Sequence, residues 1–75
     1  MTSVIERKTR GQARFLRLPE VLARTGLSRS TIYVRLEQGR FPRPVSLGSR
    51  AVGWIEAEVD EWIRERIDES RSDAE

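Results

Sequence analysis

The sequence contains no cysteine and no histidine. These two absences exclude disulfide bonds, thiolate nucleophiles, histidine-based acid–base pairs and the usual ligand sets of zinc. Acidic residues are present, but nine of the twelve fall in residues 54–75, in a helix-like pattern rather than around an apolar pocket. We therefore expect a protein that is not an enzyme and that uses no cofactor and no metal ion.

Long hydrophobic runs are also missing. No apolar stretch approaches the roughly 18 residues of a membrane-spanning helix, and the first residues, MTSVIERKTR, lack the apolar segment of a secretory signal. A chain of 75 residues has room for one small domain with a modest core. We expect a single cytoplasmic domain that does not bind membranes.

Charge is distributed unevenly along the chain, although the formal net charge is only +2. Residues 1–53 carry eleven basic and three acidic residues, a net charge of +8, whereas residues 54–75 carry three arginines and nine acids, a net charge of −6. Thirteen of the fourteen basic residues are arginine, which makes planar bidentate contacts with phosphate and with guanine edges. This pattern favours nucleic acid as a partner, but a solvated, lopsided surface has the same pattern.

Two short helices are predicted in the first half of the chain. The first covers about residues 19–25 and ends at Gly26. The second covers residues 29–38 and begins after Ser28, whose side chain caps it by accepting a bond from the backbone N–H of residue 30 or 31. Two short helices joined by a tight turn that contains glycine are typical of a helix-turn-helix.

A β-hairpin and a third helix are predicted in the second half. Residues 45–54 alternate apolar and other residues and form a two-stranded hairpin, or wing, with its turn at Gly48 and Ser49 and with Trp54 as its anchor on the core. From Glu56 the apolar residues recur at helical spacing, and this helix is expected to fray near Ile67.

The expected fold is mostly α with a small β-hairpin, a winged helix-turn-helix of three helices and a two-stranded wing. Residues 1–13 are expected to be a flexible basic arm, residues 14–68 the DNA-binding domain and residues 69–75 a disordered acidic tail. Phe15 or Leu16 is expected to pack on the core from an extended segment that leads into the domain.

The polar start of the second helix suggests how DNA is bound. A helix in the major groove meets base edges with its N-terminal residues, while Ile32 and Leu36 hold this helix on the core. The hairpin then reaches a neighbouring minor groove or phosphate strand. The predicted DNA-binding residues are Arg29, Ser30, Thr31, Tyr33 and Arg35 in the helix, Arg40 and Arg43 after it, and Arg50 in the hairpin.

Each of these residues has a simpler structural interpretation as well. Ser28 is above all a helix cap, Tyr33 can pack its ring at the margin of the core, and the arginines can be solvated charges. Val34 either contacts a thymine methyl group or has no role in binding. Trp54 and Trp62 fall in phase with apolar neighbours and are expected to be core residues rather than platforms for bases.

Three segments, LRLPEVLARTGLSRSTIY, GRFPRPVSLGSRAVGW and EVDEWI, occur in this order and together closely resemble the AlpA family of phage-type transcriptional regulators. That family is similar to MerR-like and excisionase-like winged-helix domains. The resemblance covers about residues 15–67 and implies a DNA-binding protein whose SRSTIY helix reads DNA and whose LGSR hairpin is the wing. Carried onto this chain, it implies Arg29, Ser30, Thr31, Tyr33 and Arg35 in the helix, and Ser49 with Arg50 in the wing, as DNA-binding residues.

Three functions remain open from the sequence. The first is a sequence-specific transcriptional regulator that binds double-stranded DNA, also with copies of itself on adjacent sites. The second is an excisionase-like recombination directionality factor, encoded in a prophage or mobile element, that bends DNA for an integrase. The third is an antitoxin-like protein-interaction module that uses the acidic third helix and the tail.

Overall fold

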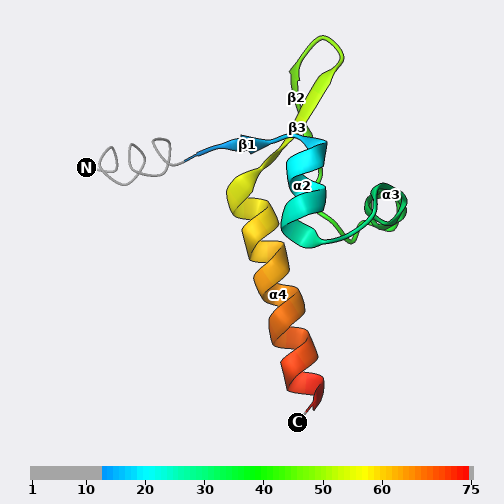
Figure 1. Cartoon of the computed structure of the whole chain (residues 1–75), viewed down its shortest axis with the longest axis vertical. Coiled ribbons are helices and arrows are strands. Elements are labelled where there is room, and N and C mark those ends of the chain that lie inside the picture. Colours follow the sequence, from blue (N-terminus) through cyan, green and yellow to red (C-terminus); the bar gives the residue numbers. More distant parts are fainter. Residues whose placement is uncertain (1–12, 75) are drawn as a thin grey trace, which may run out of the picture.

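The computed structural model describes residues 13–74, which form three helices and one small antiparallel sheet (Figure 1). The elements are β1 (Phe15–Leu16), α2 (Leu18–Thr25), α3 (Arg29–Glu37), β2 (Val45–Gly48), β3 (Ala51–Ile55) and α4 (Glu56–Ala74). The predicted mostly α class with a β-hairpin is confirmed. The predicted basic arm lies outside the described residues except for Ala13.

The sheet has three strands in the order β1-β3-β2, one more than predicted. In β1, Phe15 pairs with Ile55 and Leu16 pairs with Trp54, both in antiparallel register. The backbone N–H of Glu56 continues this pairing with a 2.8 Å bond to the carbonyl of Arg14. Two residues are too few to show a strand period, so the sequence pattern predicted an extended segment but missed its pairing partner.

The hairpin turn lies one residue later than predicted. β2 includes Gly48, which pairs with Ala51, and the turn residues are Ser49 and Arg50. The register shifts between Ser46 and Gly48, so Leu47 forms a bulge next to the turn. Gly48 therefore serves the bulge, with φ at 134°, rather than the turn itself.

Helix α2 has capping residues at both of its ends. The backbone N–H of Arg17 donates a 2.9 Å bond to the Glu20 carboxylate, and Pro19 occupies the first turn, where no N–H is needed. At its other end Gly26 adopts a left-handed conformation with φ at 75°, and its N–H bonds the carbonyl of Leu22 at 2.7 Å.

Helix α4 follows β3 without a linker and is longer than predicted. It continues to Ala74 rather than ending near Ile67, so residues 69–74 are helical and the expected irregular tail is corrected. No glycine or proline follows Ile67 to stop the helix, and an ion pair between Arg66 and Glu69 at 3.0 Å supports its last turns. No helix in residues 13–74 is long and apolar enough to cross a membrane.

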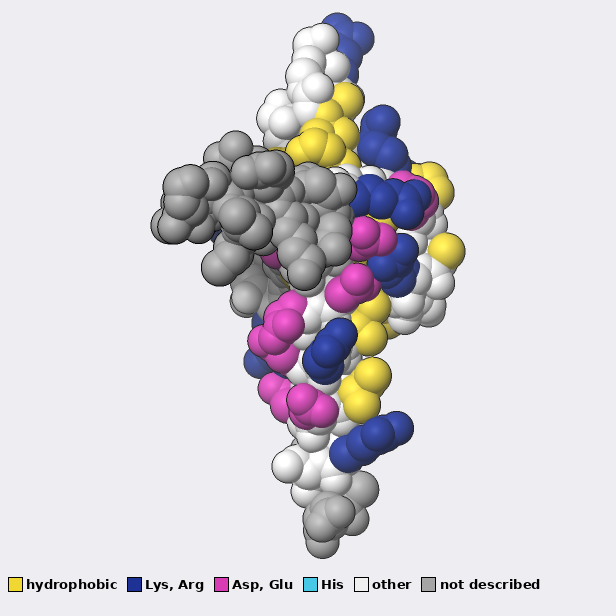
Figure 2. Space-filling view, turned by 90° about the vertical axis from the view of Figure 1, so that its left-hand side faces the viewer, with side chains coloured by type: hydrophobic (Ala, Val, Ile, Leu, Met, Phe, Trp, Pro, Cys, Tyr) yellow, Lys and Arg dark blue, Asp and Glu magenta, His cyan; other side chains and the backbone are white. Residues whose placement is uncertain are grey.

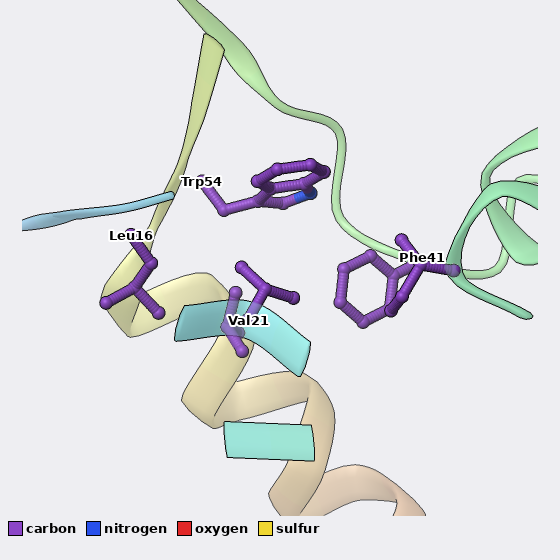
Figure 3. Close-up of a cluster of buried hydrophobic side chains, with 6 residues drawn as sticks. Leu16, Val21, Phe41 and Trp54 are labelled. Carbon is purple, nitrogen blue, oxygen red and sulfur yellow. The ribbon is translucent and has the colours of Figure 1, made fainter. Parts of the chain in front are cut away.

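The core lies where the sheet, α2, α3 and the start of α4 meet. Its buried side chains are Leu16, Val21, Ile32, Phe41, Trp54 and Val59. Figure 3 shows Trp54 beside Leu16 and Val21, with Phe41 facing the same space from the loop after α3. The indole N–H of Trp54 donates a 2.9 Å bond to the carbonyl of Pro42, which confirms Trp54 as the anchor of the hairpin.

Arginines join the elements around this core. The guanidinium of Arg24 in α2 contacts Glu56 at 2.8 Å and Asp60 at 2.9 Å, both in α4. Its hydrogen bond to Asp60, more than any other contact, raises the pKa of Arg24 above its ordinary value. Arg24 therefore joins α2 to α4 through two ion pairs.

Candidate nucleic-acid interface

The N-terminus of α3 is held by a cluster of hydroxyl groups. The side-chain oxygen of Ser28 accepts a 3.2 Å bond from the backbone N–H of Thr31, as predicted for a helix cap. The same oxygen lies 2.9 Å from the hydroxyl of Thr31 and 3.3 Å from that of Ser30. These contacts fix where the polar side chains at the start of α3 point.

One side of α3 is fixed on the core and the other side is open. Ile32 is fully buried, and Leu36, one turn later, packs against the core. Tyr33 and Val34 lie away from this contact and are 48% and 50% exposed. About half of the Tyr33 side chain is therefore covered and half is open to solvent.

A shallow hollow runs along the outward side of α3. It is lined by Ser30, Thr31, Val34, Arg35, Gln38 and Arg40. Ser30, Val34 and Gln38 are spaced four apart and therefore share one helix face. Gln38 was not among the predicted binding residues, although this spacing of four was visible in the sequence.

The hairpin presents the other predicted residues. Ser49 and Arg50 are exposed at its turn, and Figure 1 shows that β2 and β3 project from the body of the molecule. Arg50 has a φ of 64°, a left-handed conformation that a residue with a side chain adopts at a cost in energy. The tip of the hairpin therefore displays an arginine in a defined, unfavourable backbone conformation.

The arginines of this region have no carboxylate partner, a property that they share with Arg17, Arg64 and Arg71 among the described residues. Arg14, Arg24 and Arg66 each contact at least one carboxylate. Among the described residues, no carboxylate oxygen lies within 4.0 Å of the five arginines between α3 and the hairpin turn. These five are the unpaired arginine set: Arg29, Arg35, Arg40, Arg43 and Arg50. All five belong to the predicted DNA-binding residues.

Acidic side chains lie elsewhere on the molecule. Helix α4 carries eight carboxylates and three arginines, whereas residues 29–50 carry five arginines and one glutamate. Figure 1 shows that the free end of α4 points away from the hairpin, and Figure 2 shows acidic groups gathered along this helix. The charge asymmetry of the sequence thus becomes a spatial separation between the C-terminal part of α4 and the hairpin, whereas Glu58, Glu61 and Glu65 of α4 line a hollow together with Arg40.

The structure brings predicted residues together in two places. Ser30, Thr31, Arg35 and Arg40 line the hollow on α3, and Ser49 and Arg50 share the hairpin turn. Arg29, Tyr33 and Arg43 are also exposed but belong to neither group. Any role of Arg7, Lys8 and Arg10 in the basic arm concerns residues outside those that the structure describes.

Arg35 has a contact that the sequence did not predict. Its guanidinium carbon lies 5.6 Å from the centroid of the Trp62 ring. Trp62 is half-buried and packs against the core, as predicted, and its indole N–H donates a 2.7 Å bond to the carbonyl of Arg40. Helix α4 therefore contacts both a side chain and the backbone of the candidate interface.

The sequence is similar to known proteins over most of its length. The family model described as Prophage CP4-57 regulatory protein (AlpA) matches residues 14–67. Over 56 residues the chain is 54% identical to the "Uncharacterized protein ORF88" of Enterobacteria phage P4, a match that covers 75% of this chain and 64% of that protein. Over 63 residues it is 46% identical to the "DNA-binding transcriptional activator AlpA" of Escherichia coli (strain K12), covering 76% of this chain and 90% of that protein. The resemblance seen in the sequence is thereby confirmed, and the chain belongs to the AlpA family.

Proposed function

We propose that this protein is a non-enzymatic, sequence-specific DNA-binding transcriptional regulator. The observation that carries this proposal is that Arg35 and Arg40, two members of the unpaired arginine set, line the hollow on the polar outward face of α3. The name of the Escherichia coli relative, a DNA-binding transcriptional activator at 46% identity, supports the same function. A protein with this function would act in the bacterial cytoplasm, bound to the DNA of the nucleoid.

In this proposal the fold works as a winged helix-turn-helix, and α3 lies in the major groove. The groove is about 12 Å wide and admits one α-helix. Because Ile32 fixes the opposite side of the helix, Ser30, Val34 and Gln38 face the base edges. Gln38 suits adenine and Val34 suits a thymine methyl group.

The flanks of α3 face the two sugar–phosphate backbones. Arg29 and Tyr33 are one turn apart on one flank, while Thr31 and Arg35 are one turn apart on the other. Guanidinium and hydroxyl groups are the usual phosphate ligands in protein–DNA complexes. Phosphate contacts on both flanks set the register of the helix, and the base edges supply the sequence preference.

The hairpin acts as the wing and extends the contact along the duplex. Ser49 and Arg50 at its tip contact the phosphate backbone or the minor groove. Arg40 and Arg43 contact phosphates between the helix and the wing. The C-terminal end of α4 points away from the hairpin (Figure 1), so the carboxylates at that end repel DNA from a part of the molecule outside the interface. Nearer the start of α4, Glu58, Glu61 and Glu65 line a hollow together with Arg40.

The test is a binding titration by fluorescence anisotropy over a series of salt concentrations. The DNA fragments come from upstream of the protein's own gene and from a neighbouring integrase region, and scrambled fragments are the control. Site-preferring, salt-sensitive binding is expected. Weak and indiscriminate binding that disappears near physiological salt would contradict the proposal.

An excisionase-like recombination directionality factor remains the second candidate, since it would use the same surface. The family description as a prophage regulatory protein motivates it. The two functions differ in DNA bending and in recruitment of an integrase. Measuring the bend on a bound site by circular permutation, with and without integrase, separates them: a large bend with integrase recruitment favours the excision factor.

A further inference from the structure

Trp62 in α4 lies at the centre of four contacts behind α3. Its ring meets that of Phe41 edge-on, with 4.9 Å between centroids and an angle of 66° between planes. Its N–H holds the carbonyl of Arg40 at 2.7 Å. Two guanidinium groups approach the same ring, Arg35 at 5.6 Å and Arg66 at 5.2 Å from its centroid. Both distances suit a cation–π contact.

The two arginines on this ring differ in their remaining partners. Arg66 lies 3.0 Å from the carboxylate of Glu69 and 4.0 Å from that of Glu65, so its charge is balanced locally. Arg35 has no carboxylate within 4.0 Å among residues 13–72. The ring therefore holds one arginine that is already neutralised and one that is open to an anion.

Arg35 also lies at the border between two surfaces. It lines the hollow on the outward side of α3 together with Ser30 and Val34. It lines a second hollow as well, beside Trp62 and Ile63 of α4. A side chain at the edge of a groove-binding helix meets the phosphate backbone, while the centre of the helix face meets the bases.

We propose that Trp62 is a positioning residue that holds Arg35 as a contact to a DNA phosphate. This inference rests on the proposed DNA-binding function and assigns Arg35 to the backbone rather than to a base. A long side chain that is already ordered by an aromatic face loses less conformational freedom when it binds. Helix α4 thus contributes to DNA affinity through a residue that does not touch DNA.

The first experiment compares Arg35→Ala with Arg66→Ala, which remove the same charge from the same ring. Affinity is measured on a specific site and on scrambled DNA over a salt series. Arg35→Ala is expected to weaken binding to both DNAs by about tenfold and to lower the slope of log K against log salt by about 0.9, as for one phosphate. Arg66→Ala is expected to leave affinity and slope unchanged.

The second experiment tests whether Trp62 acts through Arg35. Trp62→Leu is expected to weaken binding by roughly two- to fivefold, the equivalent of one exposed cation–π contact. Trp62→Tyr keeps an aromatic face and is expected to retain most of the affinity. In the Arg35→Ala background both Trp62 substitutions should have no further effect on affinity, and urea unfolding of each variant reports stability separately.

Several outcomes would overturn the inference. Equal losses from Arg35→Ala and Arg66→Ala would show a general effect of charge. A loss from Arg35→Ala on the specific site alone would assign Arg35 to a base. If Trp62→Leu weakens DNA binding also in the Arg35→Ala background, Trp62 has a purely structural role. If Trp62→Leu does not fold, the arginine pair still tests the phosphate assignment of Arg35, and Trp62→Tyr, compared in the presence and absence of Arg35, tests the role of Trp62. Failure of the unaltered protein to bind DNA would instead contradict the proposed function itself.

Discussion

Leu47 packs against the place where a side chain at position 53 would lie. A β-carbon on Gly53 would be only 2.8 Å from Cδ1 of Leu47 and 3.3 Å from the carbonyl oxygen of Leu16. Gly53 is buried in β3, between β1 and β2. Because Gly53 has no side chain, the side chain of Leu47, the bulged residue of β2, can pack against β3 at this position. This contact joins the hairpin to the core.

Gly53→Ala is expected to destabilise the domain by about 1 to 3 kcal/mol, since overpacking a close contact forces its neighbours to move. Urea unfolding measures this change. Combining it with Leu47→Ala removes the closest atom, so the loss in the double variant should be smaller than the sum of the two single losses. Strictly additive losses would show that Leu47 is not the obstacle.

The hydroxyl of Ser28 should contribute to stability independently of any DNA contact. Ser28→Ala removes the acceptor for the Thr31 N–H and is expected to lower the free energy of unfolding by about 1 kcal/mol. Ser28→Asp restores an acceptor and should be close to the original stability when measured without DNA. Equal destabilisation by both substitutions would contradict the capping role.

Local signals in the sequence account for the elements that were predicted correctly. Ser28 and Gly26 act within a few residues of themselves, so the start of α3 and the end of α2 follow from chain-local chemistry. Ile32 was placed on the core by helical periodicity alone. The position of α3 and its outward face could therefore be predicted before any tertiary contact was known.

The features that were missed depend on contacts between distant segments. The pairing of β1 with β3 involves only two residues on each strand and leaves no periodic pattern. Phe41 lies in a loop, where no period marks it as buried. The contact between Arg35 and Trp62 joins α3 to α4 across 26 intervening residues. Such contacts are set by packing, and a single sequence carries no local signal for them.

The distal part of α4 should be dispensable for folding. A chain that ends at residue 68 loses the exposed Arg66–Glu69 pair, which as a surface ion pair is worth about 0 to 1 kcal/mol. Its unfolding free energy should therefore change by less than about 1 kcal/mol. A much larger loss would show that this part of the helix stabilises the core.

Because Arg50 has a left-handed backbone conformation, two substitutions at this position can separate its contribution to DNA binding from its contribution to stability. Arg50→Gly removes the charge and relieves the backbone, so it should be more stable than Arg50→Ala by about 1 kcal/mol. Both variants should bind DNA more weakly and with a shallower salt dependence, by about 0.9 in slope for one phosphate. If Arg50→Gly keeps full affinity and slope, the hairpin tip does not contact the backbone.

Arg29 tests whether the exposed start of α3 lies on DNA. Arg29→Ala is expected to lower affinity for a specific site by about 1 to 3 kcal/mol while leaving unfolding unchanged, because the side chain is exposed and makes no ion pair in the described part of the chain. Arg71→Ala is the matched control, since it removes an equally exposed arginine from the far end of α4. Because Arg29 lies on the flank of α3 that is proposed to face a phosphate backbone, its loss should weaken binding to specific and to scrambled DNA alike, and a loss confined to specific DNA would assign Arg29 to a base. Equal affinities of the two variants on every DNA would place the interface away from the start of α3.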